Sequence, residues 1–232
     1  MADQQIALLE SMIGRADRLL SELEQIYRQD LNAKQVSPDA LNITHEVIEK
    51  CSNVLDQAMT LAFEREIKPK LSEQPKRGGY FPAANDELAY RSALGQWKAA
   101  DLDQLAPNLD SKLRSLQPFT NGTNAIFARI RELANKKHTG LTPQVRHEER
   151  RVNVTRPGQS GVSWGQGVTF GGGVSVMGVP IDPRTQMPVH TQGINVTVET
   201  WVSFRLQVGG EDAMSFCKLA VQAVRRAVQT LF

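Results

Sequence analysis

Apolar residues recur at the 3.6-residue spacing of an α-helix through most of the first 140 positions. Residues 3–32 predict one long amphipathic helix, and residues 38–66 predict a second. The second begins at Ser37-Pro38-Asp39, where a capping serine precedes a proline at the first helical position. The two are expected to form an antiparallel hairpin. Shorter helices are predicted over 85–97 and 108–116.

Residues 124–143 close this helical half. Arg131, Asn135 and His138 stand at i, i+4 and i+7, so they project from one face of the predicted helix. Ile126, Ile130, Leu133 and Ala134 supply much of the opposite face. This polar stripe is the densest group of candidate chemistry in the chain, and a solvated helix face is the alternative interpretation.

After Gly140 the period changes from 3.6 to 2, which is the spacing of β-strands. Residues 145–155 predict a strand, and residues 168–179 predict a hairpin around three consecutive glycines, Gly171 to Gly173. From 194 to 208 nearly every even position is apolar, so one face of this strand is expected to be buried. Residues 211–232 predict a C-terminal helix that covers the sheet.

Helices followed by strands and a final helix indicate an α+β fold with an antiparallel sheet. We expect an N-terminal helical bundle domain over residues 1–140, made of the long hairpin and shorter helices. A second domain over residues 141–232, the antiparallel sheet with its C-terminal helix, is expected to pack on the first.

Composition adds limits to this picture. The 232 residues are 41% hydrophobic and 22% charged, as in an ordinary soluble globular protein, and the net charge of +2 does not by itself indicate nucleic-acid binding. Charges interrupt the N-terminal segment every few residues, so it predicts neither a signal peptide nor a membrane span. We therefore expect a cytoplasmic protein that does not bind a membrane, with Cys51 and Cys217 as reduced core residues.

Arg131 and His138 also have the residue types that metal-free RNA cleavage needs. A histidine can transfer the proton of a 2′-hydroxyl or leaving group, and an arginine can neutralise the charge that develops on phosphorus. The pair fits the R-x4-6-H spacing and resembles that of HEPN-domain ribonucleases, in which, as the resemblance implies, residues of two protomers meet at a helical interface. Candidate nucleic-acid contacts are Lys76, Arg77, Lys136 and Lys137, with solvated surface charge as the alternative.

A longer stretch resembles a group of poorly characterised bacterial proteins with HEPN-like helical domains. The likeness rests on the early helical hairpin, on Tyr80-Phe81-Pro82, and on a Leu-x-x-Leu-x-x-x-x-Lys-His turn. This chain matches that turn with Ile130 in place of the first leucine, and with three residues instead of four between Leu133 and the final Lys137-His138. This resemblance implies a helical-domain layout and no agreed activity.

No metal or cofactor site is expected. His45 and Glu49 have the i, i+4 spacing of a helical metal pair, but no third ligand is identifiable. The glycine-rich segment precedes a predicted strand, whereas phosphate-binding loops precede a helix.

The sequence therefore favours a non-enzymatic cytoplasmic binding or oligomerisation module of a bacterial assembly. A homodimer through the helical half is expected, because the first helix carries apolar residues such as Leu8, Leu19 and Ile26 beside its main stripe. A protein partner is the other expectation. The alternative function is a metal-independent HEPN-like endoribonuclease or toxin, and RNA is a partner only in that case.

Overall fold

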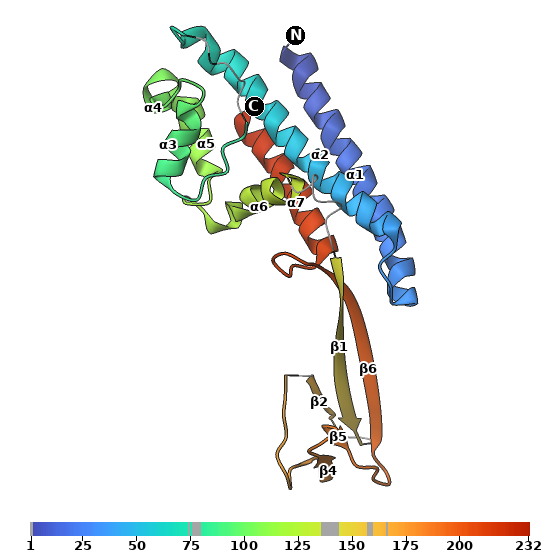
Figure 1. Ribbon diagram of the computed structural model, residues 1–232. Helices are drawn as coiled ribbons and strands as arrows, with labels where there is room; N and C mark the ends of the chain where they lie inside the picture. Colours follow the sequence, from blue (N-terminus) through green and yellow to red (C-terminus); the bar gives the residue numbers. More distant parts are fainter. Residues whose placement is uncertain (1, 74, 76–79, 136–143, 157–159, 166) are drawn as a thin grey trace. The chain divides into compact units, whose positions relative to one another are not determined.

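A computed structural model describes residues 2–73, 75, 80–135, 144–156, 160–165 and 167–232 (Figure 1). The chain divides into two compact units. We call residues 1–145 together with 205–232 the helical unit, and residues 146–204 the strand unit. Helices first, antiparallel strands next and a helix at the end confirm the predicted α+β fold.

The helical unit is built on a hairpin of two long helices, α1 (Ala2–Ala33) and α2 (Pro38–Ala62), as the sequence predicts (Figure 1). Ser37 caps α2, since its Oγ accepts a hydrogen bond from the amide of Ala40 at 3.2 Å. The Asp30 carboxylate in turn accepts hydrogen bonds from the amide and the hydroxyl of Ser37, at 2.8 and 2.9 Å. After α2 the chain continues through a π-helical turn, η1 (Phe63–Ile67), and a 3-10 turn, η2 (Lys68–Lys70).

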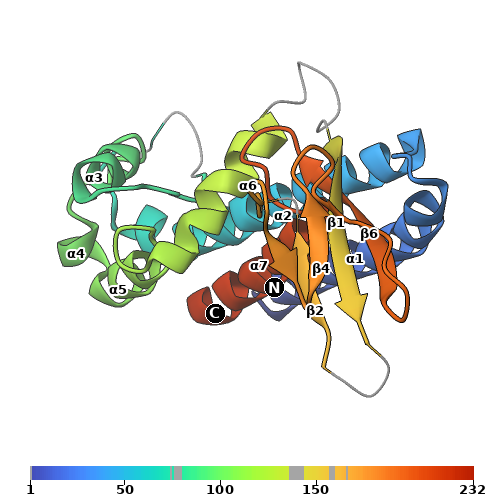
Figure 2. The same cartoon turned by 90° about the horizontal axis from the view of Figure 1, so that it is seen from below.

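Three short helices follow: α3 (Glu87–Gly95), α4 (Leu102–Leu105) and α5 (Pro107–Ser115). Figures 1 and 2 both show them gathered at one end of the helical unit. A 3-10 turn, η3 (Gly122–Asn124), leads into α6 (Ala125–Asn135). The predicted helix over 85–97 is confirmed to within two residues at each end, and the predicted helix over 108–116 to within one.

The last helix, α7 (Ala213–Leu231), packs against α1, α2, α5 and α6 within the helical unit. Small side chains recur along its buried face and allow neighbouring helices to approach closely; they are Ala213, Cys217, Ala220, Ala223 and Ala227. The sequence grouped this helix with the sheet, as its cover, and the structure groups it with the helices. Periodicity identifies the face that is buried but does not identify the partner that buries it.

The strand unit contains two small sheets. The first has the order β2-β1-β6, from β2 (Val162–Gly165), β1 (Gln144–Thr155) and β6 (Asn195–Leu206). The second has the order β3-β4-β5, from β3 (Ser175–Val176), β4 (Val179–Asp182) and β5 (Met187–Pro188). Their shared core consists of Val152, Val154, Trp164, Val179 and Ile181.

Two expectations for the strands are wrong in detail. The chain reverses between β3 and β4 at Met177 and Gly178 and not around Gly171 to Gly173. Both turn residues have positive φ, 52° and 76°, the backbone that a two-residue turn of type I′ needs. In β6, Phe204 and Leu206 are buried, but Val196 and Val198 are 37% and 46% exposed, so the apolar face is covered only in part.

None of the helices in the described part of the chain is long and apolar enough to cross a membrane.

Candidate functional site

The structure gives Arg131, the predicted catalytic arginine, a carboxylate partner on α2. Its Nη2 lies 2.6 Å from Oδ1 of Asp56, and its guanidinium lies 5.4 Å from the ring centroid of Tyr80. Asp56 Oδ1 also accepts a hydrogen bond from the amide of Phe81 at 3.0 Å. Burial raises the pKa of Asp56, although the nearby Arg131 cation opposes this. The arrangement ties the Tyr-Phe-Pro segment to α2 and α6.

Of the other predicted site residues, Asn135 is the one that lies in the described part of the chain. Asn135 is exposed at the last residue of α6. His138, Lys136, Lys137, Lys76 and Arg77 lie outside the described residues. His45 is buried and its Nε2 lies 3.6 Å from Oε1 of Glu49. Across the described ranges, no group of three or more His, Cys, Asp and Glu side chains could hold a metal ion.

A polar network joins α3 to α5. The Tyr90 hydroxyl donates to Asp110 Oδ1 at 2.9 Å, and Arg114 Nε donates to Asp110 Oδ2 at 2.6 Å. Arg114 also holds Glu87 through both of its terminal nitrogens, at 2.5 and 2.8 Å. Burial and the adjacent Asp110 raise the pKa of Tyr90. Every polar group in this network has a partner, which is typical of a structural cluster.

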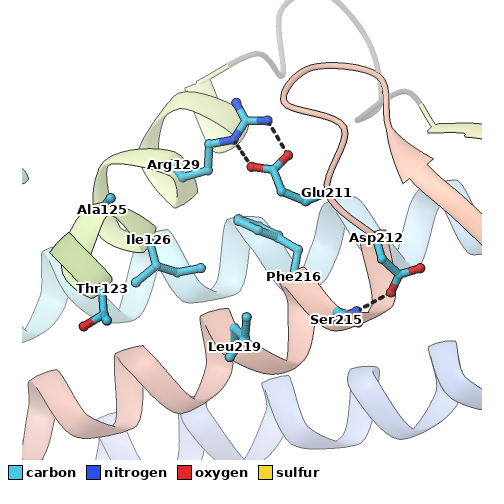
Figure 3. Close-up of a pocket in the computed structure, with 9 residues that line it drawn as sticks. All are labelled: Thr123, Ala125, Ile126, Arg129, Glu211, Asp212, Ser215, Phe216 and Leu219. Carbon is cyan, nitrogen blue, oxygen red and sulfur yellow. Dashed lines mark hydrogen bonds and ion pairs between the residues drawn. The ribbon is translucent and has the colours of Figure 1, made fainter. Parts of the chain in front are cut away.

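An apolar groove lies between α6 and the first half of α7, with a volume of 370 Å³ (Figure 3). Ile126 from α6 and Phe216 and Leu219 from α7 point into the space between the two helices. Phe216 is buried, whereas Leu219 is 56% exposed. Thr123 and Ala125 complete one end of the groove. Such a surface suits an apolar side chain of another protein.

Arg129 closes the other end of the groove. Its Nε and Nη2 donate to the two carboxylate oxygens of Glu211, at 2.9 and 3.0 Å (Figure 3). Its Nη1 donates to Glu132 at 2.6 Å, and Nη2 also donates to the carbonyl of Val208. Burial acts to lower the pKa of Arg129, but its hydrogen bonds to the carboxylates of Glu211 and Glu132 outweigh this effect and raise that pKa. For Glu211, burial acts to raise the pKa, and the Arg129 hydrogen bond and charge outweigh it and lower that pKa.

Charged residues also lie along α7 on either side of Leu219. Asp212 caps α7, since its Oδ1 accepts from the amide of Ser215 at 2.8 Å. Arg226 is exposed, and its Nη2 donates to Oδ1 of Asn124 at 2.9 Å. Asp212, Leu219 and Arg226 are spaced by seven residues, so they share one stripe of the helix, with each charge about 10 Å from the leucine.

This groove was not predicted from the sequence. The sequence does contain one signal of it, because Leu219 lies off the apolar stripe of the C-terminal helix, at a position where a polar residue is usual. The contribution of α6 to the groove could not be anticipated, since it depends on which helices pack together.

No family model, curated protein or solved structure matches the chain.

Proposed function

We propose that the chain is a non-enzymatic module that self-associates through the groove between α6 and α7, as a component of a cytoplasmic bacterial assembly. The observation that carries the proposal is Leu219, a large apolar side chain that stands exposed beside an apolar groove of the same chain. A two-fold axis near Leu219 brings the same surface of a second copy against it, so each leucine meets the groove of the other chain. An exposed leucine and a groove on one surface are self-complementary.

Charge on α7 supports an antiparallel arrangement of the two α7 helices. When two copies cross at Leu219, Asp212 of one chain lies opposite Arg226 of the other, because both are seven residues from the centre. The axis produces this contact twice. Opposite charges at the ends of an interface favour the correct pairing and disfavour a parallel one, which places like charges together.

The expected route to a dimer through α1 has less support than this one. Leu19, one of the apolar residues that suggested it, is 2% exposed, since α1 packs against both α2 and α7. Leu8 remains 58% exposed near the start of α1. The helical half is still the part of the chain that we propose for dimerisation, and the contact surface moves from α1 to α6 and α7.

A ribonuclease function has less support from Arg131. Its guanidinium is engaged by Asp56, so contact with a phosphate requires that this ion pair open.

Light scattering at 5 to 200 μM protein tests the proposal, a range chosen for an interface of micromolar affinity, about −8 kcal/mol at 1 μM. We expect wild-type protein to dimerise or assemble further as concentration rises. Leu219→Asp should weaken this association at least tenfold, because it places a carboxylate in the apolar contact. The matched control is Leu88→Asp, since Leu88 is 81% exposed on α3, away from the groove. Equal association of the two variants would contradict the proposal.

A further inference from the structure

The strand unit ends in a free sheet edge at β6. In the described part of the chain, β1 is the one sheet neighbour of β6. Residues 195–203 form no backbone hydrogen bonds there outside this sheet. The other edge is formed by β2, which has four residues, whereas β6 has twelve. The longer edge therefore presents a row of amide and carbonyl groups that another strand can pair with.

Two exposed valines of β6, Val196 and Val198, form an apolar surface beside this edge, which we call the valine shelf. Val198 of β6 lines a cavity of 530 Å³ together with Val152 of β1, Trp164 of β2 and Met187 of β5. The even-numbered residues of β6 therefore face the same side of the sheet as the core of the strand unit. Val152 and Trp164 are 7% and 6% exposed, but Val196 and Val198 remain largely accessible. The layer of β3, β4 and β5 covers β1 and β2 and leaves the apolar face of β6 partly exposed.

The edge has few of the features that usually protect such strands from pairing. Residues 195–204 contain no proline and no glycine, and Glu199 is their one charged residue. Val196, Thr197, Val198, Thr200 and Val202 are all β-branched, which favours extended backbone.

We propose that this edge pairs with β6 of a second copy, as an antiparallel β6–β6′ contact that is separate from the α6–α7 groove. Only an extended backbone matches the hydrogen-bonding groups of a sheet edge. Residues opposite each other in an antiparallel pair lie on the same face, so the valine shelves of the two copies join into one continuous apolar surface.

Charge excludes one of the possible registers. Pairing centred on Glu199 places two carboxylates directly opposite each other, which is unfavourable. Pairing centred on Val198 places Glu199 opposite Thr197 of the other copy and Thr200 opposite Val196. This register places no like charges directly opposite each other and sets Val198 against Val198 at the two-fold axis, beside the two cavities. We assign the contact to this register.

Sedimentation velocity tests the contact in a Leu219→Asp background, in which the proposed α7 contact is removed. That variant should remain a dimer at about 100 μM, a concentration suited to a contact of moderate affinity. Adding Val198→Lys should give a monomer, because two lysines then face each other across the axis. Adding Thr197→Lys instead should preserve or strengthen the dimer, since that lysine lies opposite Glu199 of the other copy.

Cysteine cross-linking tests the register. Val198→Cys should form an intermolecular disulfide on mild oxidation, because opposite residues of an antiparallel pair have Cα atoms about 4.5 to 5.5 Å apart. Thr200→Cys should not, because its two copies lie about 13 Å apart in this register. The native thiols should not interfere, since Cys51 and Cys217 are buried and burial raises the pKa of Cys51 to about 12.

These outcomes separate the two proposed contacts. A Leu219→Asp protein that is monomeric at about 100 μM, or a Val198→Lys change that leaves its dimer intact, would overturn the β6 contact. If Leu219→Asp matches wild-type protein while Val198→Lys gives a monomer, the β6 contact stands and the α7 contact is wrong. Cross-linking of Thr200→Cys in preference to Val198→Cys would overturn the register.

Discussion

The contact between Asp56 and Arg131 allows a quantitative test of whether Arg131 stabilises the fold. Asp56→Ala removes the acceptor that holds both Arg131 and the amide of Phe81. The Phe81 side chain is 1% exposed, and its ring centroid lies 5.2 Å from that of Phe127, so the amide anchors a core residue. Loss of this carboxylate should therefore loosen the packing of the Tyr-Phe-Pro segment as well as break an ion pair.

The hydrogen bond from the Phe81 amide and the ion pair with Arg131 are expected to contribute different amounts to stability. A hydrogen bond to a charged group contributes about 1.5 to 3 kcal/mol. The side chains of Asp56 and Arg131 are 26% and 32% exposed, so solvent screens their attraction, and about 0.5 to 1 kcal/mol is appropriate. We expect Asp56→Ala to cost about 2 to 3 kcal/mol, and Arg131→Ala about 1 kcal/mol including its contact with Tyr80. Asp56→Asn keeps an oxygen acceptor for Phe81 and should cost about 1 kcal/mol.

Urea unfolding followed by circular dichroism at 222 nm measures these changes, because helices dominate that signal. The double variant Asp56→Ala/Arg131→Ala completes the cycle, and a coupling energy of about 0.5 to 1 kcal/mol is expected. Costs below about 0.5 kcal/mol for both single variants, the range of ordinary surface substitutions, would refute the structural role. Loss of RNA cleavage on Arg131→Ala without loss of stability would support the ribonuclease alternative.

Three further predictions concern the helical unit. Glu211→Gln should lower the unfolding free energy by less than about 1 kcal/mol at pH 7, since the Glu211 side chain is 39% exposed. The pKa of Glu211 is lowered in the fold, so its stabilisation is present above the unfolded value of about 4.3 and is lost as pH falls; an equal loss at pH 3.5 and pH 7 in chemical denaturation would contradict this. Tyr90→Phe should cost about 1 to 2 kcal/mol by urea unfolding because Asp110, 5% exposed, loses a donor, whereas Tyr80→Phe at an exposed site should cost almost nothing. Phe127→Ala should lower the unfolding free energy by about 3 to 5 kcal/mol, as expected for a fully buried ring, and a loss below about 1 kcal/mol would show that α6 is not packed as described.

Local sequence signals were sufficient for the helices. Ser37 is the capping residue that the sequence predicts, and the structure contains its hydrogen bond to the amide of Ala40, three positions later. The long amphipathic patterns of α1 and α2 likewise determine their own buried faces. These features are local in the chain, so a single sequence is enough to predict them.

Features that depend on distant partners could not be predicted in this way. The stripe of α7 is equally compatible with covering a sheet or with packing against helices, and in the structure it packs against α1, α2, α5 and α6. Alternation in β6 predicts two unlike faces, but the layer of β3, β4 and β5 determines how far the apolar face is covered. Arg131 was recognisable as a notable residue, whereas its partner Asp56 lies 75 positions earlier in the chain.

The most direct test of the proposed function compares two adjacent arginines of α7 by sedimentation equilibrium in a Val198→Lys background, where the β6 contact is absent. Arg226→Glu should weaken the dimer at least tenfold, because each of two contacts with Asp212 changes from attraction to repulsion, about 1 kcal/mol per contact. Arg225→Glu makes the same charge change but faces Asp17 of its own chain, with 2.7 Å between Nη2 and Oδ2, so the dimer should change less than about threefold. Equal dissociation constants for the two variants would contradict self-association through the α6–α7 groove.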